Sequence, residues 1–168
     1  MPYNSTRELR CYRAPVRSPN PDRLADIEAI CRLKAAYFRT IDTRDWSGFV
    51  QLFDEDATLD GGNGRRSGRD EIVRVVSGVL DGVVSIHHGH TPEIDVDPSG
   101  QEASGIWAMD DYLEWPEQST SAGAPVGIRG YGHYYERYRK ASDGHWRFIE
   151  VLLERIRVDE LPGGMPAR

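Results

Sequence analysis

The sequence predicts an α+β domain in which three N-terminal helices pack on a curved, mostly antiparallel sheet, forming a cone that encloses a pocket. In three segments between residues 21 and 80, apolar residues recur every three or four positions, as they do along one face of a helix. From Val83 the period changes to about two, which is typical of strands, and turn residues separate the strand segments. Helices followed by a long antiparallel meander indicate an α+β architecture, and a curved sheet wrapped on helices encloses a cavity.

The first helix is predicted from about Pro21 to Ile41. Asn20 suits the N-cap and Pro21 suits the first helical position. The mostly apolar face of the helix consists of Leu24, Ile27, Ile30, Cys31, Lys34 and Phe38.

Residues 1–20 show no periodicity and are expected to form an extended arm, followed by a cone domain over residues 21–160 and a flexible tail over residues 161–168.

Two shorter helices and a strand are predicted before residue 83. The segment DWSGFVQLF (45–53) is expected to be a short helix, residues 57–60 a strand, and the glycine-rich residues 62–68 a turn. Ser67 is expected to cap a third helix that runs to about residue 80. The inward face of this helix is predicted to consist of Ile72, Val75, Val76 and Val79.

Four long strands are predicted after these helices. The segments between them carry Pro, Gly, Asp and Ser, the residues that tight turns require. The predicted strands cover residues 84–96, 102–115, 128–142 and 146–158.

Composition restricts the function classes. The 168 residues are enough for one domain, and the net charge of −6 disfavours nucleic acid and anionic membrane surfaces, which both select a basic face. Cys11 and Cys31 are too few for a disulfide framework or a zinc site. The sequence contains no run of 18 apolar residues, so no membrane span is predicted. The N-terminus lacks the apolar region of a secretory signal. We therefore expect a cytoplasmic protein that binds neither nucleic acid nor membrane.

Tyr37 and Asp42 are the first candidate site residues. Both lie near the end of the first helix, in the segment AYFRTIDTRDW. Five residues turn an ideal helix through about 500°, so the two side chains are about 140° apart and converge only if the helix ends near Thr40 or the pocket wraps the helix end. Two structural alternatives stay open: Asp42 caps the following short helix, and Tyr37 is a core or rim residue.

The segment SIHHGHTPEI supplies the second group of candidates. His87 and His88 are neighbours in a predicted strand and therefore point to opposite faces. The pair His87 and His90 raises the question of a metal, but strand residues three apart diverge, so no metal ligand is predicted; histidines with a purely structural role are the other alternative. A buried carboxylate beside a histidine orients the imidazole, stabilises its protonated form and leaves the second nitrogen free to abstract a proton.

Other polar residues in the strands have open interpretations. Tyr134, Glu136 and Tyr138 share one face of their predicted strand, and aromatic residues at this spacing indicate sheet packing. Arg155 lies among apolar residues and is either a paired structural charge or an oxygen-binding group. Of the adjacent Asp110 and Asp111, one could pair with an arginine of a neighbouring strand. The sequence lacks GxSxG, GxGxxG and GxxxxGK[ST], which argues against triad hydrolases and nucleotide or dinucleotide enzymes.

Three segments together resemble the SnoaL-like (nuclear-transport-factor-2-like) superfamily, in the branch that includes bile-acid 7α-dehydratases, scytalone dehydratases and hexachlorocyclohexane dehydrochlorinases. They are DIEAICRLKAAYFRTIDTRDW, SIHHGHTPEIDVD with IWAMDDYLEW, and GYGHYYERYRKASDGHWRF. The resemblance covers roughly residues 26–158. It implies a cone fold, commonly trimeric, with catalytic residues that match Tyr37, Asp42, His87 and Arg155, and no cofactor or metal.

The resemblance implies a function that the residues alone do not. It favours a cofactor-independent lyase, a dehydratase, that acts by His/Asp acid–base catalysis on a hydrophobic polycyclic or aromatic hydroxy-carbonyl compound, steroid-like or polyketide-like. An isomerase or cyclase that uses the same base is one alternative, and a non-catalytic binder of small molecules is another. A homo-oligomer is expected, with a trimer favoured over a dimer.

Overall fold

A computed structural model describes residues 21–62 and 64–167. The expected N-terminal arm and the Asn20 cap lie outside the described residues. The helices are a 3-10 turn at Pro21–Arg23, α1 (Leu24–Asp42), α2 (Trp46–Val50), α3 (Arg69–Val79) and a second 3-10 turn at Pro116–Gln118. The strands are β1 (Phe53–Asp60), β2 (Arg65–Ser67), β3 (Val84–Val96), β4 (Glu102–Glu114), β5 (Gly127–Lys140) and β6 (Trp146–Glu160).

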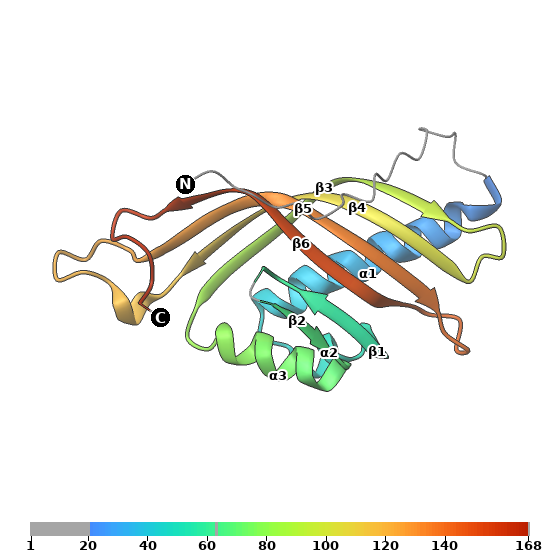
Figure 1. Ribbon diagram of the computed structural model, residues 1–168, viewed down its shortest axis with the longest axis horizontal. Coiled ribbons are helices and arrows are strands. Elements are labelled where there is room, and N and C mark those ends of the chain that lie inside the picture. The colour runs from blue at the N-terminus through green and yellow to red at the C-terminus, as the bar shows by residue number, and fades with distance from the viewer. Residues whose placement is uncertain (1–20, 63, 168) are drawn as a thin grey trace.

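The described strands form one six-stranded sheet in the order β2-β1-β6-β5-β4-β3. All neighbours are antiparallel except β1 and β6, which run parallel. The long strands β3 to β6 arch over α1, while α2 and α3 lie with β1 and β2 on one side of the cone (Figure 1). The predicted α+β cone architecture is confirmed.

Helix α1 forms because one of its faces is buried against the sheet. Its buried positions follow a spacing of three or four residues, and the end of the helix packs beside β3. The buried residues of α1 are Ile30, Leu33, Lys34, Tyr37, Thr40 and Ile41. Among the described residues, no helix has both the length and the apolar character that crossing a membrane requires.

An aromatic cluster fills the core between α1, α2 and the sheet. Phe49, Phe53 and Phe148 have no exposed surface, and the ring of Tyr37 packs against all three at centroid distances of 5.4–6.2 Å. Burying a phenylalanine contributes about 1.5–3 kcal/mol relative to leaving it exposed. This cluster therefore fixes α1 relative to β1 and β6.

Three details around α3 differ from the prediction. Residues 65–67 form strand β2 and not part of a turn, because Ser67 pairs with Thr58 of β1. The N-cap of α3 is therefore Gly68. Its φ is 87°, a value that glycine adopts readily, and its N–H donates to the carbonyl oxygen of Ala57. Val79 is 52% exposed and does not face inward, since it ends the helix where the packed face ends.

Candidate active site

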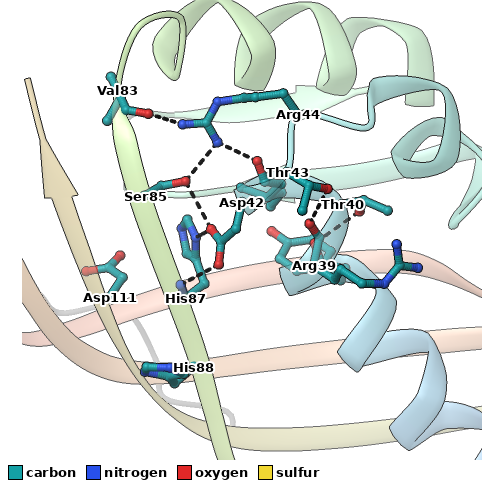
Figure 2. A network of polar contacts seen from close by, with 12 residues as sticks. Arg39, Thr40, Asp42, Thr43, Arg44, Val83, Ser85, His87, His88 and Asp111 are labelled. Carbon is teal, nitrogen blue, oxygen red and sulfur yellow. Dashed lines mark hydrogen bonds and ion pairs between the residues drawn. The ribbon is translucent and has the colours of Figure 1, made fainter.

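Asp42 and His87 meet where the end of α1 lies against β3 (Figure 2). The Nδ1 of His87 is 2.7 Å from Asp42 Oδ1, and the backbone N–H of His87 donates to Oδ2 at 2.9 Å. The hydroxyl of Ser85 donates to Oδ1 at 3.0 Å. Three donors from β3 therefore hold one carboxylate of α1, and the predicted proximity of Asp42 and His87 is present.

The His87 ring is prepared for proton transfer at its second nitrogen. Its side chain is 8% exposed, and the ring of Phe38 stacks on it with an interplanar angle of 11°. A carboxylate at Nδ1 keeps the proton on that nitrogen, which leaves Nε2 as an acceptor. Within the described part of the chain, Asp42 is the hydrogen-bond partner of this ring and Nε2 has none. Such an imidazole can take a proton from a molecule placed beside it.

The alternative role of Asp42 as a helix cap is wrong. Asp45 caps α2: its side chain accepts from the backbone N–H of Gly48 and from the hydroxyl of Ser47, both at 2.8 Å. Asp42 is instead the last residue of α1, and its carboxylate points to β3. The capping signal in this segment therefore belongs to the second aspartate.

Tyr37 lies apart from this pair. Helix α1 continues through Asp42, so the expected angular separation of the two side chains is kept. The Tyr37 ring is buried in the aromatic cluster. Burial, with the charge of Glu136, raises the pKa of the Tyr37 hydroxyl, although a hydrogen bond with Tyr134 opposes this. Tyr37 therefore stays protonated and keeps its capacity to donate.

Arg155 forms a bidentate ion pair with Asp111 close to His87. Its Nη1 and Nη2 donate to the two carboxylate oxygens at 2.9 and 2.5 Å. The Asp111 side chain is 1% exposed and that of Arg155 is 24% exposed. Asp111 lies opposite His87 in the register of β3 and β4, on the same inner face. The arginine comes from the next strand but one, and it reaches over β5 at Gly130.

A buried polar network in the interior was missed by sequence reasoning. Lys34 of α1 and Glu136 of β5 are fully buried, with Nζ and Oε1 2.5 Å apart. Tyr138 donates to the other carboxylate oxygen at 2.5 Å, and the indole N–H of Trp107 donates to Tyr138 at 2.9 Å. Two signals were present: a lysine in the apolar stripe of the first helix, and a glutamate between two inward tyrosines.

The remaining histidines of β3 face outward. His88 Nδ1 is 3.3 Å and His90 Nε2 is 2.7 Å from the Asp110 carboxylate, with more than half of each imidazole exposed. Across residues 21–62 and 64–167, no group of three or more His, Cys, Asp or Glu side chains is arranged to hold a metal ion. A groove in this part of the chain contains none of the predicted site residues, so the apolar pocket beside His87 stays a prediction. The groove that the structure does contain is lined by Phe53, Asp54, Glu55, Arg69, Ala141 and Arg147.

Comparison with known proteins gives one family and several solved structures. Residues 22–151 match the SnoaL-like domain. A Mycobacterium tuberculosis protein of unknown function, Rv3472, is 28% identical with a TM-score of 0.70, and the match covers 83% of this chain and 77% of that one. A hexachlorocyclohexane dehydrochlorinase, LinA type 2, is 22% identical (TM-score 0.72; 88% and 96% covered). A putative scytalone dehydratase from Novosphingobium aromaticivorans is 21% identical (TM-score 0.71; 86% and 95% covered).

Proposed function

Because this chain belongs to the SnoaL-like domain family, we propose that it is a cofactor-independent lyase, a dehydratase, acting on a hydrophobic polycyclic or aromatic hydroxy-carbonyl compound. The observation that carries the proposal is the Asp42–His87 pair, in which the carboxylate holds Nδ1 and Nε2 stays open. The names of two structures with the same fold, a dehydrochlorinase and a scytalone dehydratase, support elimination as the reaction class. Fold likeness alone does not define the reaction, so the argument depends on the site.

In the proposed reaction, His87 is the general base. Its Nε2 removes a proton from the carbon α or vinylogous to the carbonyl, and Asp42 stabilises the imidazolium that forms. The electron pair of the broken C–H bond moves into an enolate and then forms the new C=C bond as the C–O bond to the hydroxyl breaks. The imidazolium returns its proton to the departing hydroxide, which leaves as water. General-base catalysis of this kind contributes about 10²–10⁴-fold in rate.

Arg155 and Tyr37 are the proposed oxygen-binding groups. The guanidinium of Arg155 is held by Asp111 on two nitrogens and is partly exposed, so its other N–H groups can donate to the developing enolate oxygen. Tyr37 keeps its proton because burial raises its pKa. Its ring lies in the aromatic cluster and not beside His87, and its hydroxyl is the second proposed donor because the charge of Asp111, the partner of Arg155, acts on it. Asp111, which the sequence did not single out for the site, takes a positioning role for Arg155.

The test compares two adjacent histidines on opposite faces of β3. His87→Ala removes the proposed base, whereas His88→Ala changes an outward side chain that binds Asp110. With a panel of hydroxylated polycyclic ketones, we expect His87→Ala to lower kcat about 10²–10⁴-fold and His88→Ala to leave it within a factor of two. Unchanged turnover in His87→Ala would contradict the mechanism.

Product mass separates the remaining functions. A dehydratase product is lighter than its substrate by one water, whereas an isomerase or cyclase conserves the mass. Ligand binding without turnover in the unmodified protein would favour a non-catalytic binder. We also propose that the protein assembles as a homo-oligomer, with a trimer favoured over a dimer; the exposed apolar side chains of Val84 and Ile86 on the edge strand β3 support this.

A further inference from the structure

We propose that Arg44 is a positioning residue for the Asp42–His87 pair: it ties the end of α1 to the start of β3 and orients the carboxylate through Ser85. The inference rests on the proposed function, because it assigns a role within that site. Arg44 lies two residues beyond Asp42, in the turn between α1 and α2. Its guanidinium points back toward Ser85 and Val83, at the start of β3 (Figure 2).

The guanidinium of Arg44 bridges the two elements that carry the pair. Its Nη1 donates to the carbonyl oxygen of Ile41, in the last turn of α1, at 2.5 Å. The same nitrogen donates to the hydroxyl of Ser85 on β3 at 2.8 Å, and Nη2 donates to the carbonyl oxygen of Val83. One planar, permanently charged group thus fixes the separation between the backbones that hold Asp42 and His87.

The contact with Ser85 also determines the direction of a proton. An arginine only donates, so the Ser85 oxygen that it contacts must accept, and the hydroxyl hydrogen is free to point elsewhere. It points to Asp42 Oδ1, 3.0 Å away. Together with the Nδ1 and backbone N–H of His87, this gives the carboxylate three donors from β3. Arg44 therefore acts on His87 through Ser85 and Asp42.

The backbone at Arg44 adopts a conformation that its side-chain contacts must compensate. Its φ is 61°, and it is the only residue other than glycine with a positive φ in the part of the chain that the structure describes. A long side chain rarely occupies this left-handed region, where glycine or asparagine fits with less strain. Strained backbone persists where surrounding contacts compensate for it, and such residues gather at functional sites. Here the contacts to Ile41, Val83 and Ser85 provide that compensation.

The principal test is Arg44→Gly. Glycine adopts the required φ without strain, so the chain should fold, and only the guanidinium is lost. We expect kcat to fall about 10–100-fold, as for other groups that orient a reacting side chain, with KM within a factor of two because Arg44 does not touch the substrate. Guanidinium ion at millimolar concentration should restore part of the lost activity.

A spectroscopic readout makes the test independent of any substrate. In the free protein, the His87 Nδ1 proton held by Asp42 should give a downfield NMR resonance, assigned by its loss in His87→Ala. We expect Arg44→Gly to broaden or remove this resonance and guanidinium to recover it. Ser85→Ala, which leaves the contacts of Arg44 to Ile41 and Val83, should weaken it in the same direction. This second variant serves if Arg44→Gly does not fold.

The matched control is Arg39→Ala. Arg39 is an exposed arginine in the last turn of α1 whose guanidinium points away from Asp42 (Figure 2). It should leave the resonance and turnover unchanged. An unchanged resonance in folded Arg44→Gly and Ser85→Ala overturns the proposal. If His87→Ala leaves turnover intact but Arg44→Gly still removes the resonance, then the proposed reaction is wrong and the positioning role stands.

Discussion

Lys34 shows how one side chain sets the electrostatics of the interior. Its ammonium lies 3.5 Å from the ring centroid of Tyr134 and 4.2 Å from that of Tyr37, and Glu136 neutralises it. Burial lowers the pKa of Lys34 to about 8, although the ion pair with Glu136 acts in the opposite direction. A lysine whose pKa is lower in the folded state destabilises that state while it is charged. From this group alone, stability rises with pH from about 8 until the unfolded lysine also titrates.

Three buried tyrosines act with the opposite sign at higher pH. Burial raises the pKa of Tyr37, Tyr134 and Tyr138, so their hydroxyls keep protons that an unfolded chain loses above about pH 10. The folded state then binds more protons than the unfolded state, and stability falls as pH rises through this range.

We therefore predict that alkaline unfolding and the ionisation of buried tyrosines occur together. Absorbance of tyrosinate near 295 nm should rise in two steps: a reversible step from accessible tyrosines, and a later, steeper step that coincides with loss of the folded circular dichroism spectrum. A single gradual step in which all eight tyrosines titrate before the fold is lost would contradict this.

At the scale of residues, the sequence predicted the Asp42–His87 pair at the end of α1 and missed the fully buried Lys34–Glu136 pair. Asp42 and His87 combine a carboxylate and an imidazole in distinctive segments, and the two side chains meet. Lys34 and Glu136 are separated by 102 positions, and burial of either depends on the other. A local pattern carries no information on such a partner, so the lysine was read as part of an apolar face.

At the scale of elements, strand β5 shows how the absence of a side chain creates an interaction. A Cβ added to Gly130 would lie 1.5 Å from Arg155 Nη1 and 2.4 Å from Asp111 Oδ1. Gly130 thus opens the space through which β6 reaches β4. The sequence indicated that one of the two aspartates could pair with an arginine of the neighbouring strand. The structure instead pairs Asp111 of β4 with Arg155 of β6, because Gly130 of the intervening β5 has no side chain to block the contact.

Gly130→Ala should break the Asp111–Arg155 pair and leave a buried carboxylate without its cation. We expect the free energy of unfolding to fall by about 3 kcal/mol, measured by urea denaturation, and turnover to fall with it. Gly78→Ala is the matched control: this helical glycine in α3 has no atom within 4 Å of the added Cβ, and alanine favours the helix by up to about 1 kcal/mol. Equal stability of the two variants would contradict the role of Gly130.

The elements themselves were predicted unevenly. The four long strands match β3 to β6 within two residues at either end, because alternation over a dozen positions is a strong signal. The three-residue strand β2 was not predicted, since it is too short to show a period and it exists through its pairing with β1. The parallel contact of β1 and β6 joins distant segments and likewise leaves no local pattern.

At the scale of the whole molecule, the exposed edge of the sheet is the proposed contact surface for another subunit. Ile86 is 45% exposed on β3, the strand at the sheet edge. We predict that sedimentation equilibrium gives three times the chain mass of 19.0 kDa, and that Ile86→Lys shifts the protein toward monomers. Val79→Lys, at a similarly exposed apolar position on α3, should leave the assembly unchanged. A monomeric wild-type protein would contradict the proposed oligomer.

The place of β6 in the sheet has a consequence for how the chain is made. It is the last of the described strands to be synthesised, yet it lies inside the sheet between β1 and β5. Until β6 leaves the ribosome, the hairpin of β1 and β2 has no edge to join, and the aromatic cluster around Tyr37 lacks Phe148. The cone is therefore completed only when β6 joins the β1–β2 hairpin to the sheet of β3, β4 and β5.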